Sequence, residues 1–207
     1  MSTRYITWDE ATELFERRGL PESIWENLYE GGYALHTGDA VVDGNFPLNS
    51  DEPAPWDDVA DWDIGYIVDG DLTITGALYD VDDGAAALVV LGDLKMAGLH
   101  TTCDPKIIVT GNTTAEVLYG EYSDKYLVFR GDLRAAVQVW RSESEPDEIG
   151  GTASGSLTPA TLNAARVDNT ATPLPALLTP ELLTPTGTLD ADALHTRLLA
   201  GEPLLLP

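Results

Sequence analysis

A short motif, glycine followed by Asp or Asn, recurs four times at nearly constant spacing in the middle of the sequence. It stands at Gly70-Asp71, Gly92-Asp93, Gly111-Asn112 and Gly131-Asp132, so the glycine numbers differ by 22, 19 and 20. A degenerate copy, Gly38-Asp39, lies 32 residues before the first full copy. Self-similarity at a period of about 20 residues is typical of repeat proteins in which each unit stacks on the one before it.

The residues two and four positions before and after each glycine are mostly apolar. Because alternate residues of a strand point to the same side, these positions face one interior. They form four sets: Tyr66, Leu88, Ile107, Leu127; Val68, Val90, Val109, Phe129; Leu72, Leu94, Thr113, Leu133; and Ile74, Met96, Ala115, Ala135. The sequence therefore predicts a mainly β fold, a short single-stranded β-solenoid (β-helix) of four to five turns with about 20 residues per turn. An antiparallel meander is the alternative, and turns of one recurring type disfavour it.

Each repeat glycine marks a sharp bend. It is required there either because a Cβ would clash with the neighbouring turn or because the backbone needs a positive φ. The Asp or Asn that follows favours the same bend through hydrogen bonds to its own backbone.

Both ends of the sequence differ from the repeat. Residues 1–32 predict an N-terminal helical cap with helices over 8–18 and 21–29, and residues 33–140 the solenoid with an acidic insertion at 46–63. Residues 141–207 predict a linker, rich in Ser, Glu, Pro and Gly over 141–159, and then a C-terminal cap with a helix over 190–200. We expect these caps to cover the open ends of the solenoid, with the apolar tail 204–206 docked.

Charge excludes several classes of partner. The formal net charge is −24, with 35 acidic residues and only three lysines, Lys95, Lys106 and Lys125. Such a surface repels phosphate backbones and anionic lipid, so neither nucleic acid nor membrane is an expected partner, even for the helix pair near the N-terminus. A basic protein, a cation or a salty cytoplasm would suit it, and acidity shared by a whole proteome is the competing explanation.

The single cysteine, Cys103, cannot form an intrachain disulfide, which gives no support for an oxidising compartment. The first residues lack the apolar segment of a secretory signal, and no run approaches 18 apolar residues. We expect a cytoplasmic protein.

Catalytic motifs are scarce. His36, His100 and His195 are scattered and form no zinc-ligand spacing with one another or with Cys103. No nucleophile elbow, P-loop or dinucleotide-binding glycine motif occurs. We expect no catalytic residues, no metal site and no cofactor, and therefore no enzyme; a carbohydrate-active enzyme remains the third-ranked alternative.

Two acidic clusters carry nearby aromatic residues, and they are the predicted partner-binding site. Neither matches a known calcium-binding spacing, so a solvated acidic face or a docking surface with aromatic anchors remains. The predicted site comprises Trp56, Asp57, Asp58, Asp61, Trp62, Asp63, Tyr79, Asp80, Asp82 and Asp83.

The four repeats resemble those of the bactofilin type of bacterial polymer-forming β-helix proteins. They are still more similar to a looser, non-filament group with helical caps, in which tyrosines and a short polar turn precede a final Gly-Asp-Leu; here that stretch is 119–133. The closing helix 189–203 shares this similarity. The resemblance implies a bacterial β-helix, and for the looser group a contextual link to immunity proteins that neutralise toxins.

These observations favour a non-enzymatic cytoplasmic protein-binding module, most concretely a toxin-neutralising immunity-type protein that uses an acidic surface. A bactofilin-like cytoskeletal scaffold is the alternative. We expect a monomer or small homo-oligomer, because covered ends would prevent filament growth.

Overall fold

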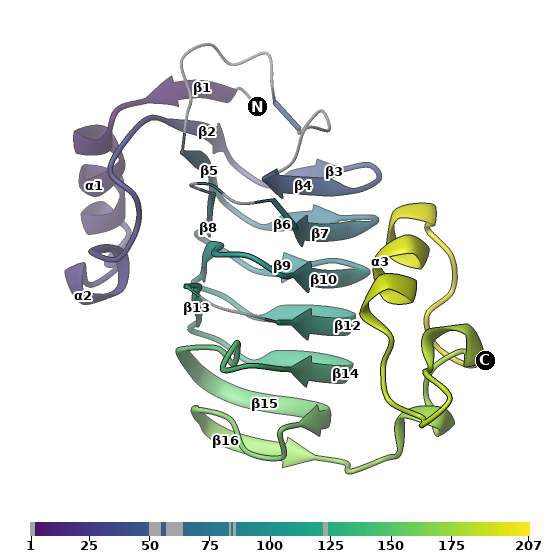
Figure 1. The fold of residues 1–207 in the computed structure, drawn as a ribbon. Coiled ribbons are helices and arrows are strands. Elements are labelled where there is room, and N and C mark those ends of the chain that lie inside the picture. The colour runs from purple at the N-terminus through teal and green to yellow at the C-terminus, as the bar shows by residue number, and fades with distance from the viewer. Residues whose placement is uncertain (1–2, 50–54, 57–63, 83, 85, 122–123) are drawn as a thin grey trace.

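The computed structural model describes residues 3–49, 55–56, 64–82, 84, 86–121 and 124–207. Its strands join in one continuous parallel array that winds as a β-solenoid, with an antiparallel strand at one edge (Figure 1). Successive turns pair in parallel, which excludes the antiparallel meander. The mainly β solenoid predicted from the repeats is therefore confirmed.

Three faces run along the solenoid. The first face consists of β2 (Tyr33–Thr37), β5 (Gly65–Asp69), β8 (Ala87–Val90), β11 (Lys106–Val109) and β13 (Tyr126–Phe129). The second contains β3 (Ala40–Val42), β6 (Leu72–Ile74), β9 (Leu94–Lys95) and the first residues of β12 (Thr113–Gly120) and β14 (Leu133–Trp140). The third contains β4 (Phe46–Asn49), β7 (Ala77–Asp80), β10 (Gly98–Thr101) and the last residues of β12 and β14.

The interior columns follow the predicted register. Leu94 pairs with Leu72 on one side and with Thr113 on the other, and all three side chains are buried. Fifteen of the sixteen inward side chains are buried, including Met96 and Ala135, which are 5% and 8% exposed. The exception is Ala115, which is partly buried. The degenerate copy also fits, since Ala40 pairs with Leu72.

The bends at the repeat glycines are crowded, not left-handed. A Cβ on Gly92 would lie 2.5 Å from the backbone oxygen of Gly70, and one on Gly131 would lie 2.4 Å from that of Gly111. Of the two reasons for glycine that the sequence left open, close approach of the neighbouring turn is therefore the one that operates at these repeats.

The solenoid continues beyond residue 140. The stretch predicted as a linker over 141–159 instead contains β15 (Glu148–Thr158), which pairs in parallel with β13 and β14, and β16 (Ala164–Asn169) follows it. The Gly- and Ser-rich composition misled the prediction because small residues are needed here: a Cβ on Gly150 or Gly151 would lie within 2.4 Å of the previous turn. The predicted boundary at 140 is therefore wrong.

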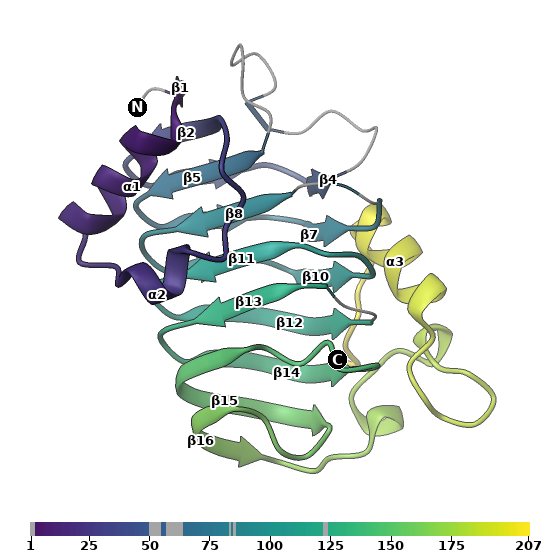
Figure 2. The same cartoon turned by 60° about the vertical axis from the view of Figure 1, so that its left-hand side comes forward.

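The helices lie along the flanks of the solenoid. An N-terminal layer, α1 (Trp8–Arg17) and α2 (Glu22–Trp25), packs on the outer side of the first face against Ile67, Val89, Ile108 and Val128 (Figures 1 and 2). The second helix, predicted over 21–29, is shorter than expected and ends at Trp25. The first helix, predicted over 8–18, is confirmed to within one residue.

A C-terminal layer covers the outer side of the third face. It contains η1 (Leu174–Ala176), η2 (Pro180–Leu182), α3 (Ala191–Ala200) and the tail, and its leucines pack against Ala77, Val117 and Val137. Asp190 caps the start of α3 and Gly201 ends it in the left-handed region, so the helix predicted over 190–200 is present. Leu204 is buried.

The second face carries no such layer among the described residues. Its outward column contains Val41, which is 74% exposed, and the exposed side chains of Lys95, Thr114 and Arg134. A polar outer side needs no apolar cover.

Candidate partner-binding surface

Trp56 is half-buried at the N-terminal end of the solenoid. Its ring stacks on His36 at 4.9 Å between centroids and meets Phe46 and Tyr66 at 5.9 and 6.0 Å. Much of this ring therefore packs within the molecule, next to the core. Five other residues of the predicted site, Asp57, Asp58, Asp61, Trp62 and Asp63, lie outside the described residues.

The second half of the predicted site is divided between the interior and the surface. Tyr79 is 2% exposed, because its ring packs against His195 of the C-terminal layer, and Asp80, the last residue of β7, is 1% exposed. Asp82 is exposed, and its carbonyl oxygen accepts a hydrogen bond from Asn49 Nδ2 at 2.7 Å. Asp83 lies outside the described residues. Tyr79 and Asp80 are therefore not available as surface anchors, which corrects their assignment to an exposed docking loop.

Tyr79 belongs to an aromatic and histidine cluster between the third face and α3. The ring of His195 lies 5.5 Å from Tyr79 and 4.8 Å from His100, and His100 stacks on Tyr119 at 5.2 Å. No sequence pattern indicated this cluster, because His100 and His195 come from elements 95 residues apart. The repeat could have suggested only that Tyr79, His100 and Tyr119 are neighbours, because these three residues occupy equivalent positions on adjacent strands.

Burial controls the protonation of this cluster. Loss of hydration, together with a smaller contribution from the positive charge that His195 can carry, lowers the pKa of His100 to about 4. Burial, together with the hydrogen bond to Glu121, raises the pKa of the Tyr119 hydroxyl. Both shifts favour the neutral forms of His100 and Tyr119.

Arg141 ties this cluster to the chain that leads into α3. Its guanidinium lies 5.5 Å from the Tyr119 ring and donates a 2.7 Å hydrogen bond to the Leu189 carbonyl. These contacts hold the C-terminal layer on the solenoid, so we assign the cluster a structural role.

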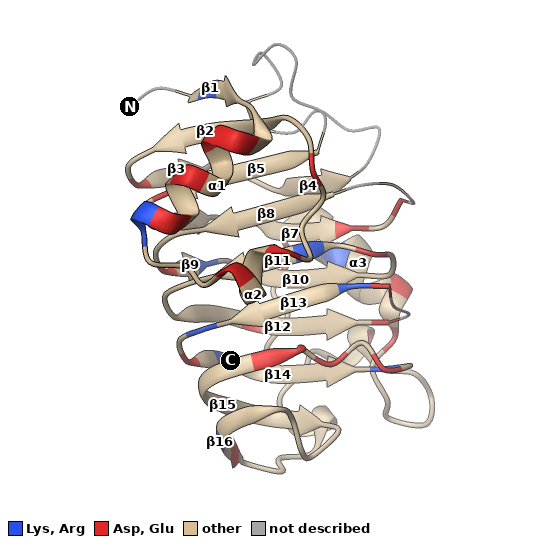
Figure 3. Cartoon of the chain, turned by 90° about the vertical axis from the view of Figure 1, so that its left-hand side faces the viewer, with Lys and Arg blue, Asp and Glu red and all other residues tan. Residues whose placement is uncertain are grey.

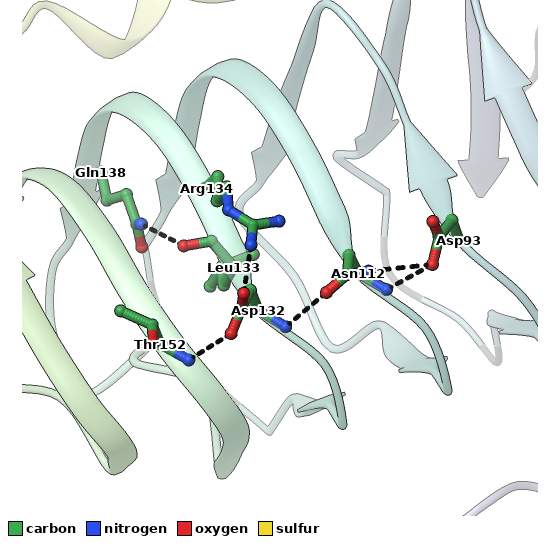
Figure 4. Close-up of polar contacts among 7 residues, drawn as sticks. All are labelled: Asp93, Asn112, Asp132, Leu133, Arg134, Gln138 and Thr152. Carbon is green, nitrogen blue, oxygen red and sulfur yellow. Dashed lines mark hydrogen bonds and ion pairs between the residues drawn. The ribbon is translucent and has the colours of Figure 1, made fainter.

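The acidic residues of the repeat bend form a hydrogen-bonded column. The backbone N–H of Asn112 donates to Asp93 Oδ1 at 2.7 Å, that of Asp132 donates to the Asn112 side chain at 3.1 Å, and that of Thr152 donates to Asp132 at 2.7 Å (Figure 4). Arg134 also pairs with Asp132. One oxygen of each side chain therefore satisfies the next turn, and this column is part of the scaffold.

The N-terminal layer presents a second group of acidic residues, which sequence reasoning did not select. Figure 3 shows acidic segments along the outward sides of α1 and α2. The exposed members on residues 9–30 are Asp9, Glu10, Glu13, Glu16, Glu22, Glu26 and Glu30. We call this group the acidic layer.

Few cations neutralise the acidic layer. Thr7 and Glu10 form a capping box at the start of α1, and Arg4 pairs with Glu10 at 3.2 Å. The hydrogen bond from the Thr7 backbone N–H and the pairing with Arg4 lower the pKa of Glu10. Arg18, at the other end of α1, pairs with Asp69 outside the layer at 2.6 Å. Amphipathic spacing in 8–17 could have revealed these acids as one outward face.

A groove of about 400 Å³ lies between the C-terminal tail and the bend that joins the second and third faces. Aliphatic and small residues dominate its lining, with two glutamates. The lining residues are Thr75, Gly76, Ala97, Glu116, Leu198, Gly201, Glu202, Pro203, Leu204 and Leu205. Glu202 forms an ion pair with Arg197 at 3.1 Å, whereas Glu116 takes part in no ion pair among the described residues. The groove lining contains no histidine, cysteine or serine that could act beside Glu116.

The described residues contain no group of three or more His, Cys, Asp or Glu side chains placed to hold a metal ion. Within the same residues, no helix has both the length and the apolar character needed to cross a membrane. Comparison with protein-family models, with curated proteins and with solved structures finds no match to this chain.

Proposed function

We propose that this chain is a non-enzymatic, cytoplasmic protein-binding module, most concretely of the toxin-neutralising immunity type, and that it binds a basic protein through its acidic layer. The observation that carries the proposal is the contrast between the two sides of the N-terminal helices. Their apolar sides are committed to the solenoid, whereas the exposed surface of residues 9–30 carries seven acids, five of them on α1 and α2.

Charge favours a basic partner. At a net charge of −24, electrostatic attraction accelerates encounter with a basic surface and repels acidic competitors. Occlusion of a basic active-site cleft would need no catalytic residue on this chain. The acids at 57–63 lie outside the described residues, and that part of the predicted site remains a prediction.

The bactofilin-like scaffold is less favoured by the geometry. Filament growth needs two ends that accept further strands, but β1 (Thr3–Ile6) runs antiparallel on β2 at one edge, and Pro47 lies within the edge strand β4. Antiparallel pairing breaks the parallel repeat, and proline lacks the N–H that a new strand would need. We propose that these two features protect the N-terminal end.

The test is capture of partners from cells of the source organism with three immobilised baits, followed by quantitative mass spectrometry. The baits are the wild type, a Glu13→Gln/Glu16→Gln/Glu26→Gln variant, and a control variant, Glu116→Gln/Glu143→Gln/Asp192→Asn. Both variants remove three exposed charges, so they differ only in location.

The proposal expects one basic protein that binds the wild type and the control but is lost from the acidic-layer variant. Its association rate, measured by surface plasmon resonance, should fall as salt rises from about 50 to 500 mM, because the Debye length shrinks from roughly 14 to 4 Å. Equal capture by both variants, or salt-independent association, would reject the acidic layer as the binding surface and leave the acidity as a property of the proteome.

A further inference from the structure

The last strand of the solenoid, β16, has an open edge. It pairs with β15 on one side, and no other strand of the described chain pairs with it (Figures 1 and 2). Ala165, Arg166, Val167 and Asp168 are all exposed. Val167 occupies the column of Leu133 and Ala153, which face the interior, yet it is 36% exposed because no further turn covers it.

The backbone of this edge can accept another strand. The N–H of Thr170 donates to the Gly155 carbonyl, and since backbone groups alternate in direction along a strand, the N–H groups of Val167 and Asn169 point to the open side. Exposed edges are usually protected by proline, lysine or a covering segment. The sequence of β16, Ala-Ala-Arg-Val-Asp-Asn, contains neither residue.

Charge around β16 differs from the rest of the chain. Between Ile149 and Pro180 the only charged residues are Arg166 and Asp168, which cancel, whereas the whole chain carries −24. Both side chains are exposed, and neither forms an ion pair within the described part of the chain. Two copies can therefore approach at this end without the repulsion that other surfaces would produce.

We propose that two copies of this chain pair through β16, antiparallel and two-fold symmetric about Val167. In that register Val167 lies opposite Val167 of the second copy, and their outward N–H and C=O groups bond reciprocally. Arg166 of each copy then lies opposite Asp168 of the other. The strand sequence is thus charge-complementary to itself in the antiparallel direction, and the contact covers the exposed inward-facing valines.

This pairing ends at two copies. A two-fold contact uses the same edge of both partners, so no open β16 remains, and the N-terminal end offers an antiparallel β1 and Pro47 in β4. The inference is independent of the proposed partner-binding function, which concerns the opposite end and flank of the molecule.

Sedimentation equilibrium of the full chain over about 1 µM to 1 mM tests the pairing. The wild type should show a reversible monomer–dimer equilibrium. Arg166→Asp and Asp168→Arg should each weaken it at least about tenfold, because each places two like-charged pairs across the contact. The double variant Arg166→Asp/Asp168→Arg should restore the dimer to within about threefold, since it only exchanges the two sides.

Two control variants, Lys95→Asp and Asp82→Arg, make the same changes in net charge at exposed positions away from β16 and should leave the dimer unchanged. Circular dichroism confirms that each variant is folded. A monomer at every concentration would overturn the proposal, as would a dimer that the single changes do not weaken or that the double variant fails to restore.

Discussion

The two flanking layers solve the same problem with different chemistry. Both cover an apolar outer face of the solenoid, but the N-terminal layer does so with Trp8, Phe15 and Trp25 in edge-to-face and tilted contact. The C-terminal layer adds to its leucines the half-buried His195, whose ring meets the buried His100 of β10. The difference teaches that one repeat scaffold can carry one cover built on aromatic packing and another whose stability depends on keeping His100 neutral.

The largest effect on stability should come from disrupting the solenoid interior, because both layers pack on the solenoid. Leu94→Asp places an unpaired charge in the interior column between Leu72 and Thr113, which costs several kcal/mol against a total stability of about 5–15 kcal/mol. We expect loss of the folded state in circular dichroism. Asp93→Asn is the matched control: Asn112 already performs the same hydrogen bonding one turn later, so its melting temperature should change little. Equal stability of the two variants would refute the register.

Each layer should then respond to truncation of its own apolar anchor. Phe15→Ala, at a fully buried position, should cost about 3–5 kcal/mol, and Leu194→Ala about 2–5 kcal/mol. Hydrogen exchange should show the loss of protection in β5 and β8 for the first variant, and in β10 and β12 for the second. If either variant loosens both flanks equally, the layers are not separate units.

A decrease in pH should destabilise the C-terminal layer through His100. The unfolded His100 has an ordinary pKa near 6.5, and the folded one titrates at about 4. Stability is therefore complete above pH 6.5 and falls as the pH decreases toward 4, because only the unfolded state binds the proton; the loss should be about 1–3 kcal/mol at pH 4.5. His195 and Tyr119 contact the His100 ring, and the charged Glu121 and Arg141 contact Tyr119.

Chemical denaturation at pH 7 and 4.5 measures this loss. His100→Phe keeps a ring against Tyr119 and should remove most of the pH-dependent difference, whereas His36→Phe, beside Trp56 at the other end, should retain it. An unchanged pH dependence in His100→Phe would assign the effect to the acidic residues instead.

The smallest effect on stability should come from the outward side of the N-terminal layer. Glu13→Gln with Glu16→Gln should change the free energy of unfolding by less than about 0.5 kcal/mol, because both side chains are exposed and take part in no described ion pair. Thermal melts measure this. A loss above about 1 kcal/mol would mean that these acids have a structural role, which would weaken the case for a binding surface.

The sequence could predict the interior but not everything that covers it. Tyr66, Val68, Leu72 and Ile74 alternate around one glycine, so their common side follows from strand geometry. On the first face, however, the intervening Ile67 and Val89 are buried as well, under α1 and α2. A continuous apolar run shows burial on both sides but not which segment provides the second cover.

The candidate site was less accessible to sequence reasoning. Tyr79 and Asp80 stand in an acidic stretch that resembles a surface loop, yet the C-terminal layer, more than a hundred residues later, buries Tyr79 against His195. The acidic layer escaped notice because helix amphipathicity becomes a surface only after the solenoid takes the apolar side.

The sequence by itself determined the repeat, its register and the glycine bends, because these depend on residues about 20 positions apart that must match in every turn. Tertiary structure alone decided that Gly92 and Gly131 are needed for close approach, that the helices lie along the flanks, and that His100 meets His195. It also extended the solenoid through the Gly- and Ser-rich β15 and left β16 at its edge. Contacts between distant segments depend on which apolar surfaces remain uncovered after the repeat has folded, and no local pattern encodes that.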